Sequence, residues 1–167
     1  DSGSPRVRPD ESLWTAVVLA GSRSERDALS EHFGTPMKAL IPVAGQPMVA
    51  RVIRTLLATS RIGTVLILAQ KPEALLPGEL GRLAENGRVR VGASAGAIAE
   101  TLARTLGSPE APWPVLVTTG DHPLLTSEMV DYFLSAAGET DFSVGVVQRR
   151  FIAGSYPGSR RTWVRFR

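Results

Sequence analysis

The chain has 167 residues, 43% of them hydrophobic, which is enough to build the core of one domain. Its formal net charge is +3, but only 21% of its residues are charged and the arginines are dispersed along the chain, so we expect no nucleic-acid partner. Cysteine is absent, which excludes disulfides and thiolate metal sites and is compatible with a reducing cytoplasm, where we expect the protein. No apolar run approaches the length of a bilayer span, so we expect no membrane span. The sequence leaves the oligomeric state open.

Residues 1–12 are rich in Pro, Ser and Arg and contain no apolar stretch, which predicts a disordered leader rather than a signal peptide. We expect a single domain over residues 13–167. It begins with an apolar, partly β-branched run at 16–19, which is typical of a strand buried on both faces.

The loop after this strand combines small residues with positive charges. Small side chains let the backbone N–H groups at the end of a strand approach an anion closely. The small residues are Ala20, Gly21 and Ser22, and the positive charges that follow are Arg23, Arg26 and Lys38. This order predicts a phosphate-handling site, for which a nucleoside triphosphate is the obvious anion.

The rest of the chain alternates between helical and strand periodicity, which predicts an α/β fold with a mostly parallel sheet and crossover helices. We expect helices at 47–59, within 71–81, at 94–106 with Ser94 as N-cap, and at 126–137. The expected strands are at 64–69, 88–91, 114–119 and 141–148, and residues 161–167 resemble a strand that is cut short.

A second group of candidate residues follows the strand at 114–119. In open α/β sheets, ligands bind beyond the carboxyl ends of the strands, and this is where Gly120 and Asp121 stand. A carboxylate there is suited to Mg²⁺, although Asp followed closely by Pro is also common in ordinary turns. The neighbouring His122 is expected to be a hydrogen-bonded loop residue, because Mg²⁺ prefers oxygen.

Together these motifs resemble the signature of sugar-phosphate and cofactor nucleotidyltransferases, which include the MobA-like group, N-acetylglucosamine-1-phosphate uridylyltransferase and methylerythritol-phosphate cytidylyltransferase. The matching residues are Leu19, Ala20, Gly21, Ser22, Arg26 and Asp27, then Lys38, Leu40, Pro42, Val43, Gly45, Pro47 and Met48. Ser22 replaces a second glycine of that signature, Asp27 stands where methionine is common, and the gap before Lys38 is longer than in the shortest members. The G-D-x-P-L-L stretch beginning at Gly120 resembles the family motif whose aspartate holds Mg²⁺.

The resemblance implies a three-layer α/β/α, Rossmann-like, glycosyltransferase-A-like fold. It also implies Mg²⁺-dependent transfer of a nucleoside monophosphate from a nucleoside triphosphate to a phosphorylated small molecule, such as a sugar phosphate, an alditol phosphate or a cofactor precursor, with release of pyrophosphate. Family members usually continue further and carry a second acidic ligand, so the resemblance implies a domain that is incomplete at residue 167.

The resemblance also implies a role for each matching residue. Arg26 would contact the β- and γ-phosphates, Lys38 would reach the α-phosphate and the attacking group, and Asp121 would hold the metal. The other substrate-binding candidates are Leu19, Ala20, Gly21, Ser22, Arg23 and Gly120, together with Ser94, Ala95 and Gly96, which lie in a small-residue turn. That turn would either contact the base or ribose or simply allow close helix packing.

Two other functions are considered. A non-catalytic, nucleotide-binding regulatory module would keep the phosphate loop without turnover, and the departures at Ser22 and Asp27 favour it. A Rossmann dinucleotide oxidoreductase is disfavoured, because no G-x-G-x-x-G follows the first strand. The sequence reveals neither the base nor the acceptor.

Overall fold

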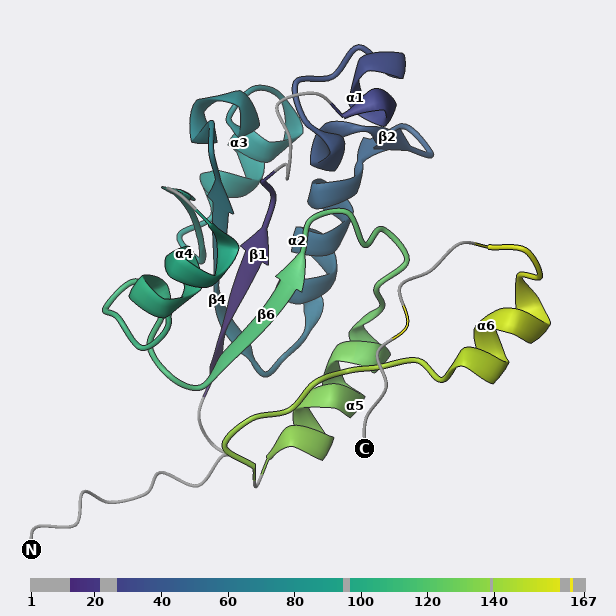
Figure 1. Ribbon diagram of the computed structural model, residues 1–167. Coiled ribbons are helices and arrows are strands. Elements are labelled where there is room, and N and C mark those ends of the chain that lie inside the picture. Colours follow the sequence, from purple (N-terminus) through teal and green to yellow (C-terminus); the bar gives the residue numbers. More distant parts are fainter. Residues whose placement is uncertain (1–12, 22–26, 95–96, 139, 160–162, 164–167) are drawn as a thin grey trace, which may run out of the picture.

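The computed structural model describes residues 13–21, 27–94, 97–138, 140–159 and 163. Its centre is a sheet of parallel strands in the order β5-β4-β1-β6 (Figure 1). These strands are β1 (Trp14–Leu19), β4 (Ile62–Ala69), β5 (Val89–Ala93) and β6 (Val115–Thr119). Each neighbouring pair is parallel, so all four carboxyl ends lie along one edge. The predicted parallel sheet is confirmed, and so are the strands predicted at 16–19, 64–69, 88–91 and 114–119.

Helices cover both faces of this sheet, as expected for a three-layer α/β/α fold. On one face lie α2 (Met48–Ala58), α3 (Glu79–Ala84) and α5 (Ser127–Ala137), whose apolar side chains form the main core with Ala16 and Val18 of β1. On the other face α4 (Ile98–Thr105) packs through Leu102 in a smaller cluster that contains Val17. Alternate side chains of β1 therefore pack into two separate cores, which explains why residues 16–19 of the strand are all apolar.

The apolar stripe predicted for residues 47–59 forms the buried face of α2. Val49, Val52, Ile53 and Leu56 are all at most 1% exposed. Their spacing puts them on one side of the helix, against the sheet. Pro47 precedes the first helical residue, where a fixed φ and a missing N–H cost the helix nothing.

A tight hairpin leads into α2. It consists of β2 (Pro42–Val43) and β3 (Gln46–Pro47), which pair antiparallel. The two turn residues, Ala44 and Gly45, have φ angles of 49° and 77°. Positive φ at both positions is what a two-residue hairpin turn of type I′ requires, and glycine adopts it without strain.

The predicted helix at 126–137 is confirmed with its cap. Thr126 is the N-cap of α5, and its hydroxyl oxygen accepts a hydrogen bond from the Met129 N–H at 3.3 Å. The helical content expected within 71–81 is divided between a 3-10 turn, η2 (Pro72–Leu75), and α3. The short helices α1 (Ala28–His32), η1 (Lys38–Leu40) and α6 (Arg149–Ser155) were not expected.

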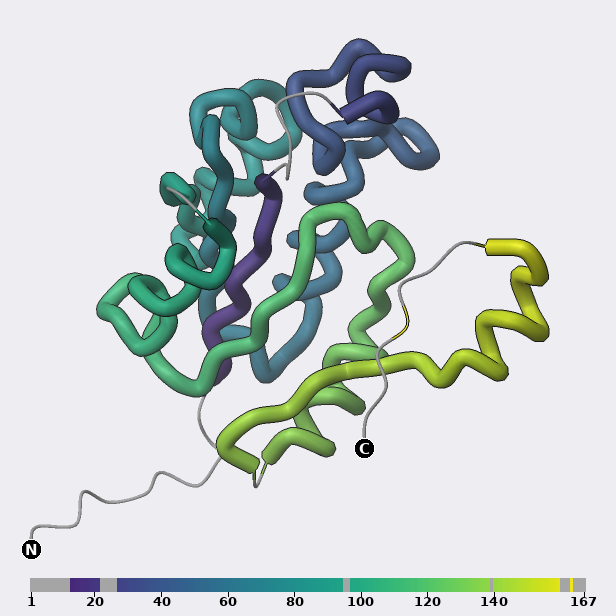
Figure 2. Tube along the Cα trace, viewed as in Figure 1, coloured from purple at the N-terminus to yellow at the C-terminus, as the bar shows by residue number. Residues whose placement is uncertain are grey.

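The predicted strand at 141–148 is wrong. This stretch is extended but pairs with no described strand, and Phe142 and Val144 are 82% and 60% exposed. It runs back past α5 toward α6 (Figure 2), and a side chain at Gly145 would touch the Phe133 ring. Apolar alternation makes a strand only where a neighbouring edge supplies hydrogen-bond partners, and the described part of the chain offers none here.

Three further expectations are either wrong or lie outside the described residues. Helix α4 begins at Ile98 with Ala97 as N-cap, so the N-cap predicted at Ser94 is wrong. The leader at 1–12 lies outside the described residues, as does the strand expected at 161–167 apart from Trp163. Among the described helices, none combines the length and the apolar character needed to cross a membrane.

The half-buried Arg88 ties the end of α2 to the beginning of β4. Its guanidinium donates hydrogen bonds to the carbonyl oxygens of Gly63 at 2.9 Å, Leu57 at 3.2 Å and Ile62. We expect Arg88→Met to lower the free energy of unfolding by about 2–3 kcal/mol, because partly buried carbonyls lose a charged donor. Arg90→Met, at an exposed position two residues further along in β5, is the control. Equal denaturant midpoints for the two variants would contradict this assignment.

Candidate functional site

The loops that follow β1 and β6 are joined at the carboxyl edge of the sheet. The Gly120 N–H donates to the Leu19 carbonyl at 2.8 Å, and the Ala20 N–H donates to the Leu68 carbonyl at 2.9 Å. The structure therefore brings the predicted residues Leu19, Ala20, Gly21, Gly120 and Asp121 to one edge, where open α/β sheets bind ligands.

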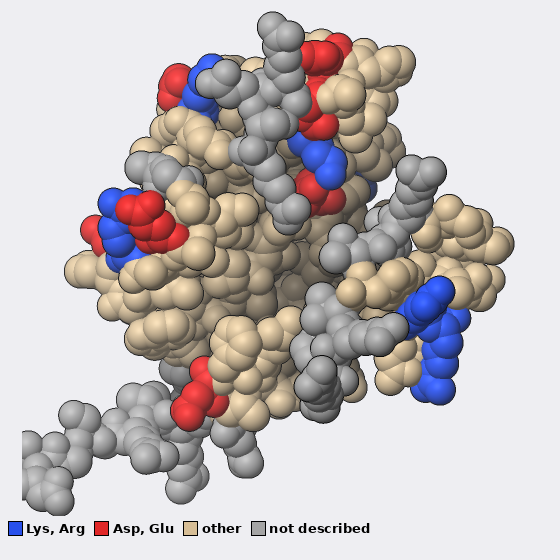
Figure 3. All heavy atoms as spheres, viewed as in Figure 1, with Lys and Arg blue, Asp and Glu red and all other residues tan. Residues whose placement is uncertain are grey.

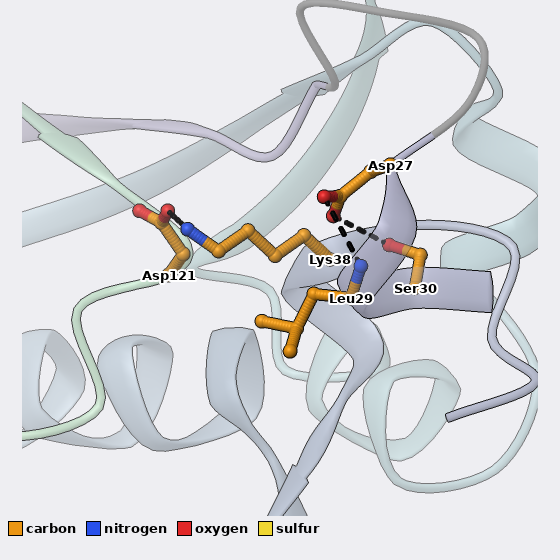
Figure 4. Close-up of polar contacts among 5 residues, drawn as sticks. All are labelled: Asp27, Leu29, Ser30, Lys38 and Asp121. Atoms are coloured by element: carbon orange, nitrogen blue, oxygen red, sulfur yellow. Dashed lines mark hydrogen bonds and ion pairs between the residues drawn. The ribbon is translucent and has the colours of Figure 1, made fainter. Parts of the chain in front are cut away.

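At this edge Lys38 and Asp121 form an ion pair. Lys38 Nζ donates to Asp121 Oδ2 at 2.7 Å, and the two side chains come from elements 83 residues apart in sequence (Figure 4). Both remain accessible, with 44% of the Lys38 side chain and 35% of the Asp121 side chain exposed. An anion or a cation can therefore reach the pair.

The backbone position of Lys38 is fixed by a short helical turn whose neighbouring side chains are buried. Lys38 is the first residue of η1, and its neighbours Met37 and Ala39 are 5% and 4% exposed. The turn is closed by hydrogen bonds from the Leu40 N–H to the Met37 carbonyl and from the Ile41 N–H to the Lys38 carbonyl, both at 3.0 Å. The buried neighbours anchor the turn, while the ammonium projects from it.

Gly120 allows the end of β6 to approach η1 and α2. A Cβ at this position would lie 3.2 Å from Val49 Cγ2 and 3.4 Å from Ala39 Cβ. A side chain here would push the strand away from the turn that carries Lys38. The glycine of the G-D motif thus has a packing role that brings the next residue, Asp121, within reach of the ammonium.

The environment of Asp121 favours its ionised form. Burial raises the pKa of this carboxyl, but side-chain hydrogen bonds with Lys38 and Thr119, together with the positive charge of Lys38, outweigh burial and hold the pKa below its ordinary value. The carboxylate is therefore charged at neutral pH, as a metal ligand must be.

Gln70 lies beside Gly21, in the loop that is predicted to bind phosphate. The sequence analysis did not identify Gln70 as a site residue. It follows β4 directly, and a Cβ on Gly21 would lie 2.7 Å from its Oε1 atom. The amide group, at the end of a flexible and exposed side chain, therefore lies directly beside the Gly21 backbone. The signal for Gln70 was its place as the first polar residue after a buried strand, at the edge where ligands bind.

Ser94 lies at the same edge, directly after the edge strand β5. Its N–H donates to the Ala69 carbonyl at 2.8 Å, and its hydroxyl lies 3.4 Å from the Thr101 hydroxyl of α4. β4 separates it from β1 and its loop. Five of the predicted site residues lie outside the described residues: Ser22, Arg23, Arg26, Ala95 and Gly96.

Asp27, which stands where the resembling family commonly has methionine, caps α1. Its carboxylate accepts hydrogen bonds from the Ser30 hydroxyl at 2.9 Å and from the Leu29 N–H at 3.4 Å (Figure 4). These contacts satisfy the beginning of the short helix. The departure from the signature therefore has a local structural function.

Asp121 suits a metal ion that is shared with a substrate better than a metal ion enclosed by protein side chains. Among the described residues, no group of three or more His, Asp or Glu side chains could hold a metal ion. Mg²⁺ commonly uses one or two carboxylates and completes its shell with water and substrate phosphates. The ionised, accessible Asp121 suits that role.

On the face drawn in Figure 3, the charged side chains of the described residues do not form one broad acidic or basic surface. Acidic and basic groups lie in small mixed patches, and a separate basic group lies over α6. Arg149 and Arg150, the first two residues of α6, are exposed, and their guanidinium carbons lie 5.7 and 5.0 Å from the centres of the Trp163 and Phe151 rings.

The geometry defines an open parallel α/β protein with an ammonium and a carboxylate paired beyond the carboxyl edge of its sheet, where proteins of this architecture bind ligands. The chain belongs to the MobA-like NTP transferase domain family, whose model matches residues 16–165. Among curated proteins, none matches the sequence significantly.

Solved structures share this fold. A hypothetical transferase from Thermus thermophilus has 30% sequence identity and a TM-score of 0.70 over 93% of this chain and 60% of its own. CMP:2-keto-3-deoxy-manno-octonic acid synthetase complexed with CTP has 20% identity and a TM-score of 0.56, covering 77% and 48% of the two chains. A 4-diphosphocytidyl-2C-methyl-D-erythritol synthase from Anaerococcus prevotii has 14% identity and a TM-score of 0.58, covering 87% and 63%. The chain thus spans about half to three fifths of these structures.

The depressed pKa of Asp121 yields a direct prediction. Because the folded-state pKa lies below the ordinary value, the ion pair contributes to stability above that value and the contribution is lost as the pH falls through the folded-state pKa. We expect Lys38→Met to raise the pKa of Asp121, since burial is then opposed only by the remaining hydrogen bonds. A carboxyl NMR titration measures this pKa. An unchanged midpoint in Lys38→Met, or an equal rise in Lys71→Met, would contradict the assignment.

Proposed function

We propose that this chain transfers a nucleoside monophosphate from a nucleoside triphosphate to a phosphorylated small molecule, with release of pyrophosphate. The family to which it belongs supports nucleotidyl transfer. The observation that carries the proposal is the 2.7 Å contact between Lys38 Nζ and Asp121 Oδ2 beside the loop that leaves β1. A site for a triphosphate with its metal needs a cation and an ionised carboxylate together, beyond the carboxyl ends of the strands.

Nucleotidyl transfer needs an acceptor oxygen to attack the α-phosphorus in line while pyrophosphate departs on the opposite side. The difficulty is the negative charge that gathers around the phosphorus, and a protein lowers the barrier chiefly by positioning and by electrostatic stabilisation. In our proposal Lys38 stabilises the charge at the α-phosphate, and the backbone around Gly21 receives the phosphate chain. Arg26, outside the described residues, is assigned to the β- and γ-phosphates.

Asp121 is the residue that would hold Mg²⁺. When bound, the ion would neutralise phosphate oxygens and help to orient them. The accessibility of Asp121 supports this role, because a ligand shared with a substrate must be open to it. Among the described residues Asp121 is the candidate protein ligand, and further ligands would come from phosphate oxygens and water.

The donor is proposed to be a nucleoside triphosphate, and one of the structures with this fold carries CTP. The acceptor is proposed to be a sugar phosphate, an alditol phosphate or a cofactor precursor. The substrate-binding candidates remain Leu19, Ala20, Gly21, Ser22, Arg23, Ser94, Ala95, Gly96 and Gly120. Gln70 joins them, because its amide group lies against Gly21.

A second candidate function is a non-catalytic nucleotide-binding module. It is favoured by the lack, among the described residues, of a group of three or more acidic or histidine side chains that could hold a metal ion, and by the use of Asp27 as a helix cap. Such a module would bind nucleotide without turning it over.

The two candidates are separated by assaying pyrophosphate release. The protein is incubated with each of the four nucleoside triphosphates, Mg²⁺ and a panel of sugar and alditol phosphates, while nucleotide binding is measured by calorimetry. We expect pyrophosphate with at least one combination. Nucleotide binding without pyrophosphate from any combination would favour the module, and the absence of nucleotide binding would reject both functions.

Variants of the ion pair test the catalytic assignment. We expect Lys38→Ala and Asp121→Ala each to lower kcat by about 10²–10³-fold, because each removes charge stabilisation from the transition state. Both side chains are partly exposed, so thermal unfolding should change little. Lys71→Ala changes the other lysine of the chain and is the control. Near-normal turnover in either ion-pair variant would remove that residue from the mechanism.

A further inference from the structure

The Lys38–Asp121 ion pair occupies the carboxylate that the proposed function assigns to the metal. Lys38 Nζ lies 2.7 Å from Asp121 Oδ2, a direct contact between the ammonium and one of the two carboxylate oxygens. A divalent cation approaching Asp121 therefore meets a partly neutralised carboxylate and the positive charge of Lys38. Two cations on one carboxylate repel each other, so they bind the same group in competition.

The other ion pairs among the described residues have different positions. Arg54 and Glu79 join α2 to α3, and Arg104 and Glu100 lie one turn apart within α4. Neither pair involves the loops that follow β1 and β6. The Lys38–Asp121 pair, in contrast, lies at the carboxyl edge of the sheet. There an anionic ligand would compete for Lys38, and a cation would compete for Asp121.

Lys38 can exchange partners without disturbing the core. Its backbone is fixed by the buried side chains of Met37 and Ala39, but its own side chain is 44% exposed. A long, flexible ammonium side chain of this kind can turn from a carboxylate to a phosphate oxygen at little cost. The Thr119 side chain also lowers the pKa of Asp121, so the carboxylate keeps a favourable polar neighbour when Lys38 leaves.

We propose that Lys38 and a divalent cation compete for the carboxylate of Asp121, so that a nucleotide, by drawing Lys38 to its phosphates, frees this carboxylate for the cation. This inference rests on the proposed function. Nucleotide and metal then bind cooperatively: the nucleotide raises the affinity of Asp121 for the metal, and by linkage the metal raises the affinity for the nucleotide by the same factor. Without nucleotide, the ion pair keeps the metal affinity low.

The first experiment uses Mn²⁺ alone and needs no turnover. Binding of Mn²⁺ to the whole chain is followed by the electron paramagnetic resonance signal of the free ion. We expect weak binding to the wild type and binding about tenfold tighter to Lys38→Met, in the usual range of such couplings. The Lys38→Met/Asp121→Asn double variant should lose the added affinity, and Lys71→Met should match the wild type. Equal affinity in the wild type and Lys38→Met would overturn the proposal.

A second measurement covers the case in which Lys38→Met does not fold. Lys38 and Lys71 are the two lysines of the chain, so acetylation of each can be followed by mass spectrometry. Saturating Mn²⁺ without nucleotide should speed the acetylation of Lys38, because the metal displaces it from Asp121, and should leave Lys71 unchanged. An unchanged Lys38 rate, under conditions where the resonance signal shows the metal bound, would also overturn the proposal.

Addition of nucleotide separates this inference from the proposed function. A nucleoside triphosphate should tighten Mn²⁺ binding to the wild type beyond the binding of Mn²⁺ to the nucleotide alone, and this gain should be smaller in Lys38→Met, where only the coordination shared with the phosphates remains. If no nucleotide binds to the wild type, the proposed function fails, while the competition measured with metal alone still stands or falls on its own result. If nucleotide binds but the gain in Lys38→Met is as large as in the wild type, the exchange is wrong and the proposed function remains.

Discussion

The 2.7 Å contact between Lys38 and Asp121 is the interaction on which the candidate site depends, and it exists because three parts of the fold converge. Because β1 and β6 are parallel, Asp121 lies at the same edge of the sheet as the loop that leaves β1. The buried neighbours of Lys38 hold its turn against the core. Gly120 lets the two approach, since its missing Cβ leaves room for Val49 and Ala39. A shift in any of these would separate two charges that nothing in the local sequence brings together.

This ion pair is better understood as part of a binding site than as a source of stability. Exposed pairs contribute about 0–1 kcal/mol to folding, and both partners here are accessible to solvent. The contacts that hold the frame lie elsewhere: the apolar stripe of α2 is fully buried, and Arg88 ties α2 to β4 through backbone carbonyls. Stability and ligand binding therefore rest on different residues, which leaves the Lys38–Asp121 pair free to open without unfolding the domain.

The sequence predicted well those features that depend on local pattern and composition. The buried strands, the stripe of α2 and the cap at Thr126 each have a periodicity or a capping residue that needs no distant partner. The strand expected at 141–148 failed because apolar alternation does not say whether a neighbouring edge will pair with it. Gln70 was missed for a related reason, since its contact with Gly21 joins two loops that the sequence separates. The roles assigned to the site residues remain predictions.

The spacing of the motif that begins at Lys38 follows from a continuous path of contacts. Lys38 begins η1, and the hairpin turns at Gly45 with positive φ. Pro47 then immediately precedes α2, which places Val49 against Gly120. Gly120 in turn precedes Asp121, whose carboxylate returns to Lys38. Adding or removing a residue within this path would rotate α2 or displace the lysine, because neither the turn nor the helix can absorb the change. The two motifs, far apart in sequence, therefore act as one structural unit.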